Sequence, residues 1–191
     1  MLILASQSPR RREILEHAGI PVEVRSAAVP EQIQEGETPV NYVLRLARAK
    51  AAAVNGDLVL GSDTVVVLDE HILEKPHDAA DALRMLRILS GREHSVITGI
   101  CLRSGDAYIT EAIETRVRFV SMSQDEMEAY VASGEPMDKA GGYAIQGLAS
   151  KYIDRIEGDY FNVVGLPVHR VHAMIKSFGV KEFNPGISVR S

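Results

Sequence analysis

Short apolar runs and segments of helical spacing alternate along the first third of the chain. Residues 2–5 are apolar and residues 22–25 alternate apolar with charged side chains, so both predict strands. Residues 9–18 and 39–54 carry apolar side chains at helical spacing and predict helices. We expect the hydroxyl of Ser8 to cap the first helix, because serine before proline is typical of a helix start. The other boundary signals are Gly19, Thr38-Pro39 and Asn55-Gly56.

The most apolar part of the chain is residues 58–68, which predicts a central strand covered on both faces. The polar tetrapeptide 61–64, Gly-Ser-Asp-Thr, interrupts this run, and we expect the strand to break there. A carboxylate such as Asp63 in apolar surroundings must be hydrogen-bonded, paired or bound to a metal. Strand ends in α/β sheets commonly face ligand sites, which favours a functional Asp63 over one that only orders a turn or a β-bulge.

The second half of the chain predicts a long hairpin and further helices. Residues 94–102 and 107–120 read as two long strands joined by a Ser-Gly-Asp turn, and residues 152–156 as a shorter strand. The intervening residues 137–150 are rich in glycine and irregular. The predicted helix starts are Asp78, Ser123 with Glu126 as a capping box, and the segment that ends at Pro167.

Strands that alternate with helices and then form a hairpin predict an α/β fold with a mixed, elongated sheet flanked by helices. No linker-like composition divides the chain. We therefore expect one domain over residues 1–180, with two lobes around a cleft, and a flexible tail over residues 181–191.

Composition and charge narrow the class of protein. The 191 residues are 46% hydrophobic and 25% charged, as in an ordinary globular protein. A formal net charge of −5 argues against nucleic acid or an anionic membrane surface as the main partner. The single cysteine, Cys101, fits a reducing compartment, and no apolar stretch is long enough to span a membrane. We expect a cytoplasmic protein.

Three consecutive arginines, Arg10 to Arg12, occupy the first turn of the first predicted helix. The N-terminus is the positive end of the helix dipole, so each cation there is unfavourable by about 0.3–1 kcal/mol. Free backbone N–H groups and guanidinium groups together bind phosphate well, which favours an anionic ligand. The alternative is three solvated arginines whose repulsion is reduced by Glu13 and Glu16. The pattern of a P-loop is absent.

Other charged residues are weaker signals by themselves. Lys50 lies late in its predicted helix, where a cation suits the dipole, and Lys75 before Pro76 is either a surface lysine or a phosphate ligand. Glu31 lies in a loop, where most glutamates are solvated. The segment 138–147 pairs glycines with an Asp-Lys pair and a glutamine, which suits a loop that approaches a base or sugar, although a structural turn has the same composition. Pattern alone indicates a polyphosphate-binding cleft with one or two carboxylates.

Taken together, these segments resemble the Maf family of nucleoside triphosphate pyrophosphatases. The resemblance implies a Maf/ITPase-like fold and hydrolysis between the α- and β-phosphates of a nucleoside triphosphate, which gives a monophosphate and pyrophosphate. It also implies a divalent cation (magnesium or manganese), a cytoplasmic location and a homodimer. The matching pieces are residues 4–15, Glu31, 47–51, 61–64, 73–76, 138–147 and 156–167.

The resemblance also implies roles for individual residues. Arg11, Thr64 and Gln146 match the subgroup that acts on dTTP and UTP, and Asp63 matches the proposed proton acceptor. Asp63 and Glu31 would hold the metal. The residues expected to hold the triphosphate are Ser6, Arg10, Arg11, Lys50 and Lys75.

Two residues depart from the family pattern, and two other functions stay open. Glu74 stands where glycine is common, and Gly142 where alanine is common. Glu74 either weakens substrate binding or supplies a metal ligand. The alternative functions are a nucleotide-binding regulator of cell division and septum formation without significant turnover, and an enzyme that removes modified pyrimidine nucleotides.

Overall fold

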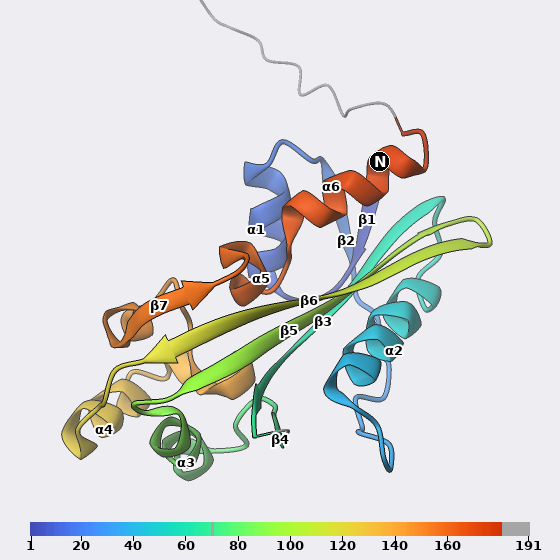
Figure 1. Ribbon diagram of the computed structural model, residues 1–191. Helices are drawn as coiled ribbons and strands as arrows, with labels where there is room; N and C mark the ends of the chain where they lie inside the picture. Colours follow the sequence, from blue (N-terminus) through green and yellow to red (C-terminus); the bar gives the residue numbers. More distant parts are fainter. Residues whose placement is uncertain (70, 181–191) are drawn as a thin grey trace, which may run out of the picture.

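A computed structural model describes residues 1–69 and 71–180 (Figure 1). It contains one mixed seven-stranded sheet in the order β2-β1-β3-β5-β6-β7, with β4 paired to β3, and helices on both faces. The predicted α/β class with a mixed sheet flanked by helices is confirmed. The tail predicted over residues 181–191 lies outside the described residues. No helix in the described ranges has the length and apolar character needed to cross a bilayer.

Most of the elements agree with those predicted, but the sequence did not predict β4 and α5. The strands are β1 (Leu2–Ala5), β2 (Val22–Arg25), β3 (Leu58–Leu68), β4 (His71–Leu73), β5 (Glu93–Ser104), β6 (Ala107–Phe119) and β7 (Ile153–Glu157). The α-helices are α1 (Pro9–His17), α2 (Pro39–Ala52), α3 (Ala79–Leu89), α4 (Gln124–Ala132), α5 (Tyr160–Val164) and α6 (Val168–Ser177). Three short 3-10 turns follow α4, namely η1 (Glu135–Asp138), η2 (Ala140–Gly142) and η3 (Leu148–Tyr152).

Side-chain caps explain why α2, α3 and α4 start where they do. The side chains of Thr38, Asp78 and Ser123 each accept a hydrogen bond from the first turn of their helix, and Ser123 forms the predicted capping box with Glu126. The prediction for Ser8 is wrong, because its side chain makes no capping bond although it is the N-cap residue. Proline, which is suited to the first helical position, starts α1 without that bond.

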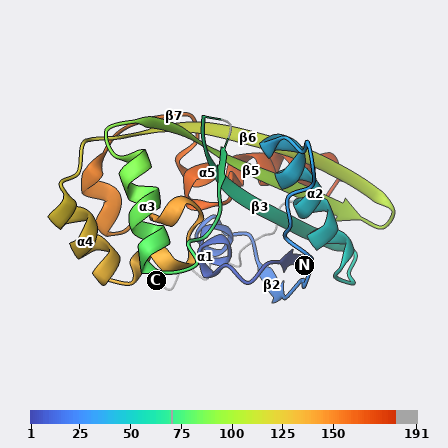
Figure 2. The same ribbon diagram turned by 90° about the horizontal axis from the view of Figure 1, so that it is seen from below.

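Both faces of the central strands are buried, as the apolar runs predicted. Leu4 and Leu60 pack with α1 and α6 in one cluster, while Val59 and Val65 pack on the opposite face beneath α2. A separate cluster at the far end of the long strands joins α3 and α4 to the sheet. Figure 2 shows α3 and α4 near one end of these strands and α2 near the other. This arrangement leaves two lobes at the two ends of β3.

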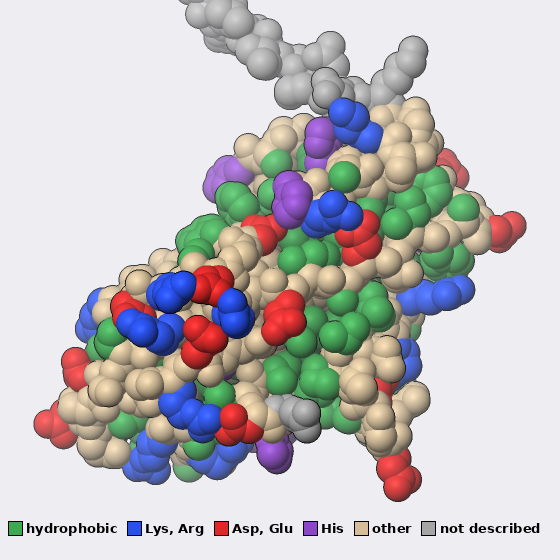
Figure 3. All heavy atoms as spheres, viewed as in Figure 1, with side chains coloured by type: hydrophobic (Ala, Val, Ile, Leu, Met, Phe, Trp, Pro, Cys, Tyr) green, Lys and Arg blue, Asp and Glu red, His purple; other side chains and the backbone are tan. Residues whose placement is uncertain are grey.

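The outer face of β6 and β7 is charged. Figure 3 shows basic and acidic side chains intermixed on one face, and cross-strand ion pairs join Arg118 to Asp154 and Arg116 to Glu157. Exposed ion pairs of this kind contribute about 0–1 kcal/mol each. This face is therefore a solvated surface, separate from the cleft described below.

The expected break in the central strand is wrong. β3 runs without interruption from Leu58 to Leu68 and pairs with β5 along nearly its whole length. Along the other edge of β3, the partner strand changes: β1 pairs with residues 59–61 and β4 with residues 66–68. Within the described chain, residues 62–65 have a partner strand on one edge only. The polar tetrapeptide thus marks a gap between neighbouring strands, which opens the middle of the sheet to a ligand.

Glycines bring α2 unusually close to the sheet. A Cβ atom added at Gly61 of β3 would lie 2.1 Å from the carbonyl oxygen of Ala47, and one added at Gly99 of β5 would lie 2.4 Å from that of Val43. Both contacts are with helix backbone, which has no side-chain freedom to move away. The absence of side chains at these two positions therefore sets how near α2 lies to β3.

We predict that Gly61→Ala lowers the free energy of unfolding by about 3 kcal/mol, the upper end of overpacking costs, because the new methyl group meets helix backbone. Urea denaturation measures the change. Gly105→Ala is the matched control: Gly105 has a left-handed φ of 57° but open space around it, so alanine costs about 1 kcal/mol there. A Gly61→Ala variant no less stable than Gly105→Ala would contradict the close packing of α2.

Candidate active site

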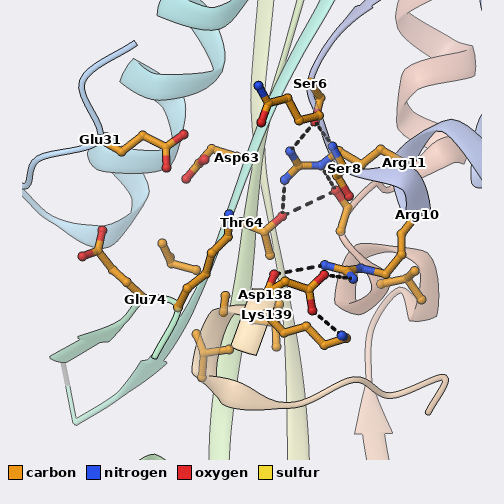
Figure 4. A pocket seen from close by; sticks show the side chains of 18 of the residues that line it. Ser6, Ser8, Arg10, Arg11, Glu31, Asp63, Thr64, Glu74, Asp138 and Lys139 are labelled. Carbon is orange, nitrogen blue, oxygen red and sulfur yellow. Dashed lines mark hydrogen bonds and ion pairs between the residues drawn. The ribbon is translucent and has the colours of Figure 1, made fainter. Parts of the chain in front are cut away.

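A cleft of about 920 Å³ opens at the gap beside residues 62–65. It is lined by the turn that precedes α1, by α2 and β3, and by the segments 27–31, 74–77, 137–146 and 163–165. Figure 4 shows side chains from these segments pointing toward one another. The structure brings all of the predicted site residues to this cleft, namely Ser6, Arg10, Arg11, Glu31, Lys50, Asp63, Thr64, Lys75 and Gln146.

A buried ammonium group joins two carboxylates in this cleft. Lys50 Nζ lies 2.6 Å from Asp63 Oδ1 and 2.6 Å from Glu31 Oε1. Lys50 and Asp63 are almost fully buried, whereas the Glu31 side chain is 48% exposed. Lys50 reaches this position because it lies in the last turn of α2, which packs directly on Gly61. The interpretation of Lys50 as a residue that only suits the helix dipole is therefore insufficient.

The environment moves the pKa values of the two carboxylates in opposite directions. Burial raises the pKa of Asp63 above its ordinary value, although the charges of Lys50 and Arg11 oppose the shift. Burial also acts to raise the pKa of Glu31, but the hydrogen bond and charge of Lys50 and the charge of Lys75 outweigh it and lower that pKa. Asp63 is thus the stronger base of the pair, and Glu31 stays ionised.

Tyr42 holds a third carboxylate beside this pair. The hydroxyl of Tyr42, a buried residue of α2, donates to Glu74 Oε1 at 2.7 Å and lies 3.1 Å from the carbonyl oxygen of Glu31. Burial, followed by the nearby charge and hydrogen bond of Glu74, raises the pKa of the Tyr42 hydroxyl. Tyr42 therefore ties the Glu31 loop to the Glu74 segment. Tyr42 could not be recognised from the sequence, because it occupies an ordinary apolar-face position of the helix.

The three arginines of α1 have three different environments. Arg11 is buried and donates to the carbonyl oxygens of Gly165 and Ser62 at 2.8 and 2.9 Å. It also donates to Ser6 Oγ at 3.1 Å and to Thr64 Oγ1 at 2.9 Å. A guanidinium group has five N–H donors, so the part of the chain described here uses four of them. Arg11 thus places a positive charge in the wall of the cleft, and one of its N–H groups has no partner among the described residues.

Arg10 and Arg12 differ from Arg11 and from each other. Arg10 Nη1 lies 3.0 Å from Asp138 Oδ2, across the cleft from α1 (Figure 4). Arg12 Nε lies 2.7 Å from Glu16 Oε1, one helical turn away on the exposed surface. The solvated interpretation therefore fits Arg12 alone, and the other two arginines face the cleft.

Three predicted residues are placed to meet a ligand from different sides. Thr64 Oγ1 lies 3.0 Å from Thr98 Oγ1 and accepts from Arg11, so its position is fixed. Lys75 and Gln146 are exposed at the cleft, and neither side chain has a polar partner among residues 1–69 and 71–180. An ammonium group and a carboxamide are therefore available for binding.

The donor set of the cleft suits a divalent cation that also contacts phosphate. Among the described residues, no three Asp, Glu, His or Cys side chains group closely enough to hold a metal alone. Asp63 and Glu31 nevertheless converge on one cation, the ammonium of Lys50. Magnesium is usually held by one or two carboxylates together with substrate phosphates and water, so this pair fits it.

Comparisons with known proteins identify a family for the chain. The Maf-like protein family matches residues 1–178. A dTTP/UTP pyrophosphatase of Koribacter versatilis is 52% identical over 183 residues, which are 94% of this chain and 95% of that protein. Proteins of the same name from Symbiobacterium thermophilum and Bacillus cereus are 49% and 45% identical, covering 97% and 94% of this chain and 97% and 96% of theirs.

Among solved structures, the Staphylococcus aureus Ham1 protein aligns with 64% of this chain and 72% of its own, at 13% identity and a TM-score of 0.39. The family match extends over most of the 191 residues. The three pyrophosphatases are similar along nearly their whole length. The chain belongs to the Maf-like protein family.

Proposed function

We propose that this protein is a nucleoside triphosphate pyrophosphatase that hydrolyses dTTP and UTP to the monophosphate and pyrophosphate. The name shared by relatives of 45–52% identity supports this substrate class. The observation that carries the proposal is the position of Asp63. Its buried carboxylate faces a cleft whose other walls carry Arg10, Lys75 and Ser6.

Binding of the triphosphate rests on charge. Arg10, Lys75 and the hydroxyl of Ser6 contact the phosphates, and Arg11 adds a fixed positive charge and one N–H donor. Arg10 must exchange Asp138 for phosphate when the substrate binds. Charge-assisted bonds to a phosphate favour this exchange, because the pair with Asp138 is partly exposed and weak.

Asp63 acts as the general base. It accepts a proton from a water molecule as the water oxygen forms a bond to the α-phosphorus. The bond from that phosphorus to the bridging oxygen breaks, and pyrophosphate leaves with the bonding electrons, held by the cationic side chains. The raised pKa of Asp63 strengthens it as a base, and Lys50 keeps it ionised and oriented.

Asp63 and Glu31 are the residues that would hold magnesium or manganese. When bound, the metal neutralises phosphate oxygens and lowers the pKa of a water molecule. Glu74 is held by Tyr42, so its first role is to fix the wall of the cleft. Cytoplasmic location, a homodimer and a single domain over residues 1–180 stay predictions.

Gln146 and Thr64 form the specificity side of the cleft. The carboxamide of Gln146 carries both donors and acceptors, as the hydrogen-bonding edge of a pyrimidine does. Thr64 accepts a hydrogen bond from Arg11, which links two of the three residues of the expected subgroup pattern. A regulator that only binds nucleotides needs no acidic group beside the phosphates. The presence of Asp63 in the cleft therefore favours an enzyme over such a regulator. Modified pyrimidine nucleotides stay open as substrates of the same site.

We predict that the purified protein with magnesium releases pyrophosphate from dTTP and UTP faster than from CTP and GTP. Pyrophosphate release with each triphosphate, with and without metal, measures this preference.

We also predict that Asp63→Asn lowers kcat about 10²–10⁴-fold, which is the usual contribution of a general base. The same release of pyrophosphate measures kcat of the variant. Asp57→Asn, an exposed aspartate just before β3, is the control and keeps wild-type turnover. Wild-type kcat in Asp63→Asn would remove the base from the mechanism.

A further prediction concerns pH. The positive charge of Lys50 opposes the rise in the pKa of Asp63, so Lys50→Met raises that pKa further. A general base works only when deprotonated, so the acid limb of kcat/KM moves to higher pH in this variant. The profile of kcat/KM for UTP against pH measures the shift, with the exposed Lys176→Met as control. An acid limb at the wild-type pH would show that Lys50 and Asp63 are not coupled.

A further inference from the structure

The backbone on both sides of Gln146 is held by one side chain and its partner. Gln146 lies in the irregular segment between η2 and η3, where no helix or strand supports it. The carboxylate of Glu135 accepts the N–H of Leu148 at Oε2, 3.0 Å away, and the hydroxyl of Tyr130 at Oε1, 2.8 Å away. The hydroxyl of Tyr130 in turn accepts the N–H of Ala144 at 3.2 Å.

The packing around Gly147 shows how closely the carboxylate supports this segment. A Cβ atom added at Gly147 would lie 2.2 Å from Glu135 Oε2, so the carboxylate lies directly against the backbone next to Gln146. Residues 144 and 148 are thus anchored to one unit, and Gln146 projects from the arch between them. The unit is itself fixed on α4, because Tyr130 is buried in the core.

Glu135 has no second structural role that would explain these contacts. In the part of the chain that the structure describes, its carboxylate bonds only to Tyr130 and Leu148, and it forms no ion pair. Its backbone is held separately, since the N–H donates to Ser133 Oγ at 3.2 Å and the carbonyl oxygen accepts from Lys139 Nζ at 2.7 Å. The carboxylate is therefore dedicated to the Gln146 arch.

We propose that Glu135, acting with Tyr130, is a positioning residue for pyrimidine recognition: it sets where the carboxamide of Gln146 meets the base of the bound nucleoside triphosphate. The proposal rests on the proposed function, in which Gln146 reads that base. A carboxylate suits this task because it accepts two donors at once, the N–H of Leu148 and the hydroxyl of Tyr130, which itself accepts from Ala144. In Glu135→Gln, an NH₂ group replaces one of the two carboxylate oxygens. This new donor faces either the Tyr130 hydroxyl or the Leu148 N–H, which are donors themselves.

The test compares Glu135→Gln and Tyr130→Phe with wild type, using UTP and GTP as substrates and pyrophosphate release as the readout. We expect KM for UTP to rise about tenfold in Glu135→Gln, the size of effect given by losing a hydrogen bond to a charged group, with little change in kcat. The kcat/KM preference for UTP over GTP falls by the same factor. Glu128→Gln, on the exposed side of α4, is the matched control and keeps the wild-type preference.

Combination with Gln146→Ala separates positioning from general destabilisation. If Glu135 acts through Gln146, adding Glu135→Gln to Gln146→Ala lowers kcat/KM for UTP by less than about twofold. Tyr130→Phe keeps the buried ring and removes only the hydroxyl, so it tests the same arch if Glu135→Gln folds poorly. Thermal unfolding of each variant monitors stability.

An unchanged UTP preference in both single variants, or a full additive loss in the double variant, would overturn the proposal. A wild-type protein that releases pyrophosphate from UTP and GTP equally well would instead overturn the proposed pyrimidine specificity, and the role of Glu135 with it. The wild-type comparison therefore separates the two failures before any variant is measured.

Discussion

The ion cluster of Lys50 with Asp63 and Glu31 is the interaction on which the site depends. Removing charges from water is costly, and a buried pair is tolerated only when its geometry is good. Here the geometry comes from backbone packing: α2 lies against Gly61 and Gly99, and the last turn of the helix carries Lys50 to within 2.6 Å of Asp63. Loss of one partner of such a pair typically costs about 3–5 kcal/mol, so fold and chemistry are coupled at this point.

The second constraint is the gap in the sheet beside β3. Because β1 ends opposite Gly61 and the antiparallel β4 ends opposite Val66, residues between them present both a backbone edge and side chains to the cleft. Arg11 closes part of this edge by donating to the carbonyl oxygen of Ser62 and to Gly165, which precedes α6. A single guanidinium group therefore joins α1, β3 and the α5–α6 turn. The lining of the cleft carries five lysine and arginine side chains against four carboxylates, whereas the whole chain has a formal net charge of −5.

Much of the fold could be predicted from the sequence, because local signals specify it. The strand over residues 58–68, the long hairpin and the capping box at Ser123 all follow from periodicity and short-range chemistry. The expected break at residues 61–64 was wrong, because a polar tetrapeptide also occurs where a neighbouring strand ends. That gap depends on β1 and β4, which lie far away in the sequence.

The residues that line the candidate site could be predicted from the sequence, but their arrangement could not. Residues with charge or an unusual position, such as Asp63 and the arginines, stood out in the sequence. The different environments of Arg10, Arg11 and Arg12 depend on Asp138, Gly165 and Glu16, and only the last of these is a local neighbour. Tyr42 and Glu135 left no signal, since each looks like an ordinary helix or turn residue and acts through contacts formed on folding.

The most direct test of the central claim is a crystal structure of the protein with a non-hydrolysable α,β-methylene analogue of dTTP and magnesium. We predict that the α-phosphate lies beside Asp63, that the outer phosphates contact Arg10 and Lys75, and that the base lies at Gln146. The result would contradict this prediction if the phosphates lay away from Arg10. It would also contradict it if no part of the nucleotide lay near Asp63 and that carboxylate still contacted only Lys50.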